Sequence, residues 1–204
     1  KIKHLIDSPE YNKIFHTKLQ EDSKAAGRWE TAQGGEYFAA GVGGAITGRG
    51  ADLLVIDDPH SEQDALSETK MESAYEWYTS GPRQRLQPGA SIVLVMTRWS
   101  LKDLTGMLLK HQKDVKADQW ELVEFPAIMD DGEPMWPEYW TKQELLKAKA
   151  TLPITKWNAQ FMQAPTSEEG AIIKREWWRE WKNDWIPDLH HVIQSYDTAF
   201  LKKE

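Results

Sequence analysis

The sequence predicts an α/β fold built on a parallel sheet. The apolar run at 53–56 passes directly into two aspartates and a proline at 57–59, which is typical of a strand that is buried on both faces. A second apolar run, SIVLVM at 91–96, follows a helical pattern, and WELVEFP at 120–126 follows another. Strands that alternate with helices indicate a parallel sheet with helical crossovers.

Three segments precede the first strand. Residues 9–26 are predicted to be helical, because Ser8 and Pro9 suit a helix start and apolar residues follow at helical spacing. Residues 29–38 are predicted to form a hairpin around two central glycines. The stretch at 39–50 has five glycines in twelve residues, but a strand follows it, so it lacks the strand–turn–helix order of a dinucleotide fingerprint.

The remaining elements alternate helical patterns with turn signals. Helices are expected over 60–79, ended by a Gly-Pro pair, and over 103–110. A helix over 141–150 carries a capping-box pattern. The elements expected after it are a short helix over 153–163, a linker over 165–170 and a strand over 190–196 that ends at Asp197.

Composition excludes several functional classes. The 204 residues include no cysteine, which rules out disulfides, thiolate zinc sites and a cysteine nucleophile. The net charge of −7 argues against a generally basic nucleic-acid binder, although a local basic face remains compatible with it. No apolar run approaches the ~20 residues of a membrane span. Because the chain begins with Lys1, we expect it to be an interior piece of a longer protein.

The candidate site lies where the two central strands end. Open α/β sheets place ligands at the carboxyl ends of their strands, where Asp57 and Asp58 follow one strand and Thr97 and Arg98 follow the next. Asp57 is a candidate for holding a hydrated Mg²⁺ beside a nucleotide phosphate. The alternative is that both aspartates cap the following loop. A phosphate loop with Gly-Lys-Ser or Gly-Lys-Thr does not occur in the sequence.

Five motifs in order resemble the large subunit of tailed-bacteriophage terminase, a DNA-packaging motor. They are GVGGAITGRGADLLVIDDP, RLQPGASIVLVMTRW, WPEYW, WNAQFMQAP and SYDTAF. The resemblance runs from about Phe15 to Phe200. It implies a P-loop NTPase-type sheet that lacks its N-terminal part, a small lid subdomain and the first strand of a ribonuclease H-like nuclease domain. The implied boundaries are 1–130 for the ATPase core, 131–164 for the lid, 165–189 for a linker and 190–204 for the nuclease start.

The resemblance also implies roles in ATP hydrolysis. Asp57 would orient Mg²⁺ on the β- and γ-phosphates, and Asp58 stands where the family usually has the glutamate that polarises the attacking water. Arg49 matches an arginine that reaches the neighbouring subunit's ATP, and Arg28 is the second candidate for this role. The alternative for Arg49 is a surface arginine in a flexible turn.

Two further roles are implied beyond the aspartate pair. Thr97 and Arg98 match the coupling motif that senses the γ-phosphate and relays hydrolysis to movement. The alternative is a strand-end threonine and a packed tryptophan, Trp99. Asp197 matches the first acid of a nuclease centre that binds two ions, Mg²⁺ or Mn²⁺.

The implied partners are those of a packaging motor: double-stranded DNA, a portal protein and procapsid, a small terminase subunit, and copies of the chain in a homo-oligomeric ring. The implied location is the host cytoplasm, docked transiently on a procapsid, and not a membrane. The full-length protein would be an ATPase and endonuclease, whereas this stretch alone is expected to be inactive. The alternatives are a helicase-like P-loop ATPase acting on nucleic acid and a non-catalytic scaffold fragment.

Overall fold

A computed structural model of the chain describes residues 2–22, 25, 27–44, 46 and 48–166. The chain divides into one unit at Lys1–Glu168 and a second at Glu169–Glu204. The second unit lies outside the described residues, and with it the predicted strand at 190–196 and the proposed nuclease acid Asp197. The predicted boundaries at 130 and 164 stay predictions.

The described part is mixed α/β, as the sequence predicts. It contains two two-stranded sheets, one antiparallel and one parallel. Its elements are α1 (Ile2–Ile6), α2 (Pro9–Ile14), β1 (Arg28–Glu30), β2 (Glu36–Phe38), β3 (Ala51–Asp57), α3 (Glu68–Ser80), β4 (Leu86–Val95), α4 (Leu104–His111), α5 (Lys142–Thr151) and α6 (Ile154–Lys156), with short 3-10 turns at Asp64–Leu66 and Pro82–Arg85 and a π-helical turn at Trp157–Phe161.

The two central strands pair in parallel, and α3 connects them. Ile56 lies opposite Leu94, and Asp57 lies opposite Val95. The predicted parallel pairing with a helical crossover is therefore confirmed for these two strands. The pairing brings the carboxyl ends of β3 and β4 to the same edge, so the residues that follow them meet there.

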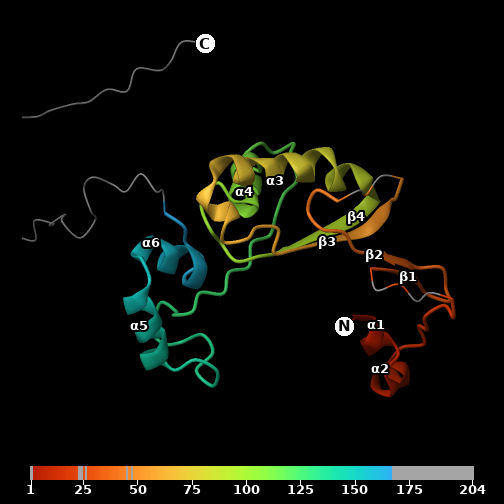
Figure 1. The fold of residues 1–204 in the computed structure, drawn as a ribbon, viewed down its shortest axis with the longest axis horizontal. Coiled ribbons are helices and arrows are strands. Elements are labelled where there is room, and N and C mark those ends of the chain that lie inside the picture. The colour runs from red at the N-terminus through yellow and green to blue at the C-terminus, as the bar shows by residue number, and fades with distance from the viewer. Residues whose placement is uncertain (1, 23–24, 26, 45, 47, 167–204) are drawn as a thin grey trace, which may run out of the picture. The chain divides into compact units, whose positions relative to one another are not determined.

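Two helices cover one face of this sheet. Figure 1 shows α3 and α4 on the same side of β3 and β4. The core on this face is formed by Ile56 with Tyr78 of α3 and with Leu104 and Leu108 of α4. The burial follows the period of each element, since residues spaced three or four apart on a helix and two apart on a strand share a face.

The prediction that both strands are buried on two faces is wrong in the described structure. Exposure alternates along β3 and β4, and on the second face Leu53 and Val55 are each 57% exposed, beside exposed Val93 and Val95. Among the described residues, no element packs on that face to the extent that α3 and α4 cover the other. The apolar run predicts two buried faces. A face is buried only if another element packs on it, and the run itself does not show whether one does.

The predicted helix over 9–26 is also wrong in length. Ser8 caps α2 by accepting a hydrogen bond from the Tyr11 amide, but the helix ends at Ile14 because Phe15 adopts an extended backbone. Beyond it, Leu19 forms an antiparallel bridge with Thr31. The segment therefore pairs with the hairpin instead of continuing the helix.

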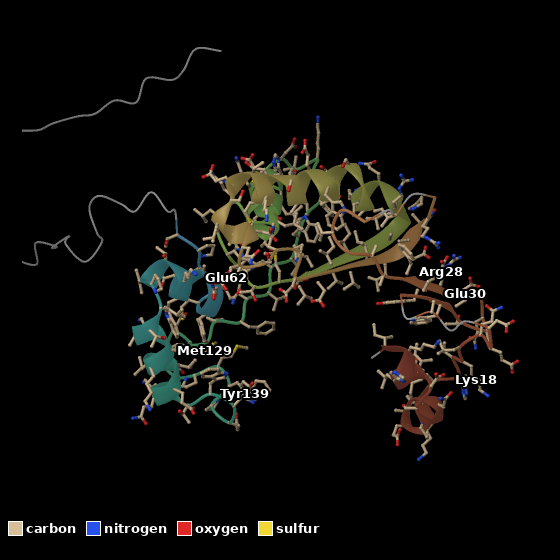
Figure 2. The ribbon with its side chains drawn as sticks, in the orientation of Figure 1. Lys18, Arg28, Glu30, Glu62, Met129 and Tyr139 are labelled. Atoms are coloured by element: carbon tan, nitrogen blue, oxygen red, sulfur yellow. The ribbon has the colours of Figure 1, made fainter. Side chains whose placement is uncertain are left out.

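The hairpin predicted over 29–38 is confirmed. Strands β1 and β2 pair antiparallel, with Trp29 opposite Tyr37. Their rings stack with centroids 4.7 Å apart, which is the close cross-strand contact that stabilises a short hairpin. Arg28 and Glu30 lie near each other on β1 (Figure 2).

Two expected elements after β3 need correction. Helix α3 begins at Glu68 and not at 60, because a 3-10 turn held by Ser61 and Asp64 precedes it. The third strand predicted at 120–126 is absent from the described structure, where these residues form no regular element. A cavity lies between this segment and β4, so the backbone bonds of a ladder are not formed.

The helices after residue 140 match the sequence patterns. Thr141 and Glu144 form a reciprocal capping box at the start of α5. The helix predicted over 153–163 is present as α6 continued by a π-helical turn, in which Trp157 is buried. Nowhere in the described residues is a helix both long enough and apolar enough to cross a membrane.

Truncating a core leucine of α4 to alanine should destabilise the protein much more than truncating a nearby leucine that lies outside the core. Leu104 is fully buried, whereas Leu101 is 52% exposed. We expect Leu104→Ala to lower the free energy of unfolding by about 2–5 kcal/mol, the range for a buried leucine. Urea denaturation should show a change below about 1 kcal/mol for Leu101→Ala. Equal losses for the two variants would contradict the core described above.

Candidate functional site

The candidate site is the rim formed where β3 and β4 end. Asp57 is the last residue of β3, and both Asp57 and Asp58 are exposed. Asp58 has a backbone φ of 42°, in the left-handed region that aspartate and asparagine occupy more readily than most residues. The chain thus turns sharply at Asp58, while Pro59 and His60 enter the interior.

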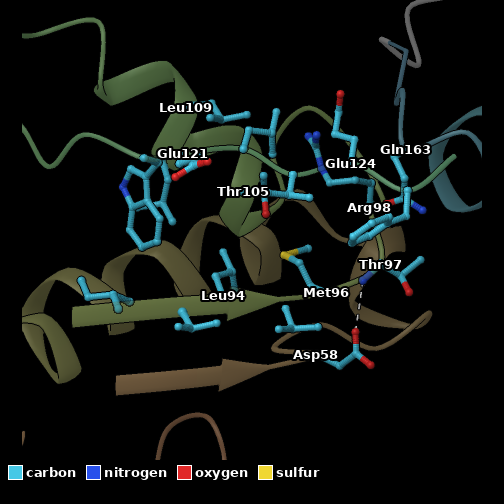
Figure 3. A pocket seen from close by; sticks show the side chains of 18 residues that line it. Asp58, Leu94, Met96, Thr97, Arg98, Thr105, Leu109, Glu121, Glu124 and Gln163 are labelled. Atoms are coloured by element: carbon cyan, nitrogen blue, oxygen red, sulfur yellow. Dashed lines mark hydrogen bonds between the residues drawn. The ribbon is translucent and has the colours of Figure 1, made fainter. Parts of the chain in front are cut away.

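Asp58 joins the ends of the two strands. Its amide donates to the Val95 carbonyl at 2.9 Å, and its Oδ1 accepts from the Thr97 amide at 3.1 Å (Figure 3). The first bond continues the parallel ladder by one residue, and the second fixes the carboxylate. The structure therefore brings two predicted site residues, Asp58 and Thr97, into direct contact. Asp58 Oδ2 forms no hydrogen bond within the described part of the chain.

Arg98 is buried and paired. Its Nε donates to both carboxylate oxygens of Asp103, at 3.2 and 3.0 Å. Its Nη2 donates to the Ser100 carbonyl at 3.3 Å. Arg98 also lines the cavity beside β4, but its charge is balanced within the protein. This geometry favours a role in holding the loop after β4.

Asp103 is the centre of that loop. It is completely buried and caps α4 by accepting from the Gly106 amide at 2.8 Å. Its Oδ2 also accepts from the amides of Trp99 at 2.9 Å and Ser100 at 3.2 Å. A buried carboxylate with these donors and a guanidinium is fully satisfied. The loop from Thr97 to Asp103 is therefore held rigidly against the first turn of α4.

His60 connects the end of β3 to the same helix. Its Nε2 accepts from the Leu104 amide at 2.9 Å, so this nitrogen carries no proton and the ring is neutral. Burial lowers the pKa of His60 below 6.5, although the charges of Asp103 and Asp64 oppose the shift. The neutral ring supplies a second acceptor for the free amides at the start of α4.

The two candidate trans-acting arginines share one carboxylate on the hairpin. Arg28 Nε donates to Glu36 Oε1 at 3.0 Å, and Arg49 Nη1 donates to the same oxygen. The guanidinium of Arg49 also lies 4.4 Å from the centre of the Phe38 ring. In the described residues neither arginine contacts the rim of β3 and β4. Their contacts with Glu36 and Phe38 therefore hold both arginines at the β1–β2 hairpin and not beside Asp57.

A cavity of about 550 Å³ opens beside β4. One wall is the strand from Ile92 to Met96, and the other is the segment 120–125 (Figure 3). Asp58, Thr97 and Gln163 also line it. The cavity therefore reaches the rim that the aspartate pair occupies.

The rim fits a magnesium ion that arrives with a phosphate ligand better than one held by the protein alone. Among the described residues, no group of three or more acidic or histidine side chains is arranged to hold a metal. Mg²⁺ commonly keeps several waters and binds one or two carboxylates together with substrate phosphates. The exposed carboxylate of Asp57 and the free Oδ2 of Asp58 suit that second arrangement.

Sequence reasoning missed two residues that hold the site together. Asp103 has the signature of a helix N-cap, an aspartate directly before an apolar helical pattern, but nothing in the pattern shows that Arg98 turns back to pair with it. His60 follows Pro59 in a polar stretch that carries no signal for burial. The His60 contact joins segments that are distant in the chain, since its partner is the Leu104 amide. Arg98 and Asp103 are only five residues apart, and their pairing depends on the conformation of the loop between them.

Comparison of the sequence with protein-family models and with curated proteins gives no match.

Removing the charge of Asp103 should strongly destabilise the protein. Asp103→Asn leaves the Arg98 guanidinium buried without its anion, and breaking one partner of a buried ion pair costs about 3–5 kcal/mol. Denaturant unfolding should show that loss. Asp130→Asn, at an exposed aspartate for which no hydrogen bond is described, is the matched control and should change stability by less than about 0.5 kcal/mol. A loss below 1 kcal/mol for Asp103→Asn would contradict the pairing.

Stability should depend on pH through His60. Because its pKa is lower in the folded state than the 6.5 of the free side chain, the unfolded state binds the proton more readily. The contribution of neutral His60 is complete above about pH 6.5 and is lost as the pH falls below it. Between pH 7 and 5, the wild type should therefore lose more unfolding free energy than His60→Gln does. The exposed His4→Gln should behave as the wild type; a His60→Gln profile identical to the wild type would refute the assignment.

Proposed function

We propose that this chain is the central part of a viral DNA-packaging motor that hydrolyses ATP to move double-stranded DNA into a procapsid. The proposal rests on the resemblance of five ordered motifs and on one structural observation. That observation is the hydrogen bond from the Thr97 amide to Asp58 Oδ1, across the ends of two parallel strands.

The bond supports the proposal because it fixes an exposed carboxylate at the ligand-binding edge of the sheet. Open α/β sheets bind ligands at the carboxyl ends of their strands. With Oδ1 held by Thr97, the free Oδ2 points to a defined direction and can accept a proton from a water molecule. A general base must first lie within hydrogen-bond reach of the proton it removes, and only then does its proton affinity matter. A carboxylate oxygen held in a fixed direction meets the first requirement.

The remaining roles follow from the same edge. Asp57 would hold the Mg²⁺ of Mg–ATP through its exposed carboxylate, and the ion would neutralise charge on the phosphates. Thr97 would sense the γ-phosphate through its hydroxyl. Arg98 would transmit that change, since it ties the end of β4 to α4 through Asp103.

Several parts of the proposal concern the whole motor. The sheet would belong to a P-loop ATPase, the segment 131–164 would act as a lid, and Asp197 would be the first acid of a ribonuclease H-like nuclease that binds Mg²⁺ or Mn²⁺. In a ring of copies on a portal, Arg49 or Arg28 would reach the ATP of a neighbouring subunit. Release from Glu36 would be required first, because both guanidiniums are bound to it.

Replacing the proposed base should nearly abolish ATP hydrolysis. Asp58→Asn keeps the shape of the side chain and tolerates the left-handed backbone, but it removes the carboxylate. We expect turnover of the full-length protein on portal-bearing procapsids to fall roughly 10²–10⁴-fold, the usual contribution of a general base. Nucleotide binding, measured with a fluorescent ATP analogue, should remain within about twofold.

Asp52→Asn is the matched control, because Asp52 is an exposed aspartate of the same strand. It should hydrolyse ATP at the wild-type rate. A near-wild-type rate for Asp58→Asn would show that Asp58 is not the base. Stimulation of the wild type by free single strands instead of procapsids would favour the helicase-like alternative, and absence of nucleotide binding would favour the scaffold.

A further inference from the structure

The turn at 136–140 presents three aromatic rings to the outside. Trp136, Tyr139 and Trp140 are 63%, 67% and 39% exposed, and Figure 2 shows Tyr139 on the loop that precedes α5. The rings of Trp136 and Tyr139 stack with centroids 5.0 Å apart, and the Trp140 ring meets the Tyr139 ring edge-on at 6.2 Å. Single exposed apolar residues are common on protein surfaces, whereas several gathered in one place mark an interaction site.

The backbone holds this aromatic turn in one conformation. The Trp136 carbonyl accepts hydrogen bonds from the amides of Tyr139 at 3.1 Å and of Trp140 at 3.0 Å. Pro137 follows directly and restricts the turn further, because its ring fixes φ. On the other side, Thr141 begins α5 with its capping box. The rings are therefore positioned before a ligand arrives, which lowers the entropic cost of binding.

The aromatic turn lies in an acidic part of the chain. Residues 129–140 include four carboxylates and no lysine, arginine or histidine; the acids are Asp130, Asp131, Glu133 and Glu138. Glu133 is paired with Lys142 at 3.0 Å. Glu138, which belongs to the aromatic turn, is exposed and forms no described hydrogen bond or ion pair. The local field therefore attracts a positively charged ligand and repels a negatively charged one.

Two other rings of the chain are covered by its own cations. The Arg49 guanidinium lies 4.4 Å from the centre of the Phe38 ring, and the Lys149 ammonium lies 5.8 Å from the centre of the Trp157 ring. Within the described ranges, no cation of the chain lies over a ring of the aromatic turn. The face of an aromatic ring carries partial negative charge and attracts a cation. The aromatic turn therefore offers open ring faces beside an unpaired carboxylate.

The combination of rings and carboxylates selects among possible ligands. Single-stranded nucleic acid stacks on exposed rings, but its phosphates would approach four carboxylates with no cation in the segment to neutralise them. A purely apolar ligand would remove water from Glu138 without pairing its charge, which is costly. A guanidinium suits both features, because its plane stacks on a ring and its N–H groups pair with a carboxylate.

We propose that the aromatic turn binds an arginine-rich segment of a partner protein. One guanidinium stacks on the rings of Trp136 and Tyr139, and the carboxylates of the segment 129–140, Glu138 above all, neutralise the charge of the bound arginines. This inference stands independently of the proposed ATPase function, because it uses neither the rim of β3 and β4 nor a nucleotide.

Synthetic peptides test the proposal directly. The probe is the fluorescein-labelled peptide Gly-Arg-Ser-Arg-Gly-Arg-Ser with a capped carboxyl end, titrated into the full-length protein and followed by fluorescence anisotropy. Two control peptides carry lysine or the neutral analogue citrulline in place of every arginine. We expect saturable binding of the probe and weaker binding of the lysine peptide, since an ammonium group does not stack. Binding of the citrulline peptide should be at least about tenfold weaker, because three charges are lost.

Variants of the central ring should locate the probe. Tyr139→Ala should weaken binding about two- to thirtyfold, the range of cation–π contacts from exposed to desolvated sites. Tyr139→Phe keeps the ring face and should bind within about twofold of the wild type. The matched control is Phe15→Ala, because Phe15 is 51% exposed and its ring also lies against a tyrosine, Tyr11, at 4.7 Å. This control should leave binding unchanged.

A second pair of variants tests the charge. Glu138→Gln should weaken binding about two- to fivefold, as expected for one exposed ion pair. Glu72→Gln removes the same charge from an exposed position on α3 and should leave binding unchanged. Equal losses for the two variants would show that the charge of the aromatic turn has no special part in binding.

Three further results would overturn the proposal. Absence of saturable binding up to about 1 mM probe would show that the turn does not bind arginine. Equal affinity of Tyr139→Ala and the wild type would show that the net charge of −7 attracts the peptide without the rings. Tighter binding of labelled oligothymidylate than of the probe, lost in Tyr139→Ala, would assign the turn to single-stranded nucleic acid. These measurements do not involve ATP, so failure here is distinguishable from failure of the proposed function.

Discussion

The parallel pairing of β3 with β4 is the constraint on which the rest of the described structure depends. Because Asp57 lies opposite Val95, the residues that follow both strands reach the same edge, and the Asp58 carboxylate can bind the Thr97 amide. A shift of the register by one residue would turn Ile56 out of the core. The same pairing therefore decides both which side chains α3 and α4 bury and which ones are presented at the rim.

Asp103 turns this edge into a rigid unit. It receives hydrogen bonds from Arg98 and from amides on both sides of the turn, and His60 adds an acceptor to the same helix end. A network of this kind is stable only when every member is satisfied. These hydrogen bonds connect the end of β3, the loop after β4 and the start of α4. A structural change at one of the three therefore affects the other two.

Local patterns predicted much of this fold, and non-local contacts explain the errors. The apolar runs at 53–56 and 91–96 predict strands because their length and the residues that close them are local properties. The helix expected over 9–26 stops early because part of it pairs with the hairpin. Burial on two faces and a strand at 120–126 require neighbours, which periodicity cannot show. The rim was predicted because each strand end is a local feature. The pairing of Arg98 with Asp103 is also local, five residues apart, but it depends on the conformation of the loop between them, which the sequence pattern does not show.

The left-handed backbone at Asp58 limits which amino acids evolution can place there. At a φ of 42°, glycine, asparagine and aspartate are accommodated at lower cost than other residues, and β-branched side chains are the most strained. Glycine has no carboxylate and asparagine is neutral, so aspartate combines this turn with an acidic group at the lowest cost. The main chain thus favours the shorter acid at position 58, and a lineage that acquired glutamate here would carry additional backbone strain.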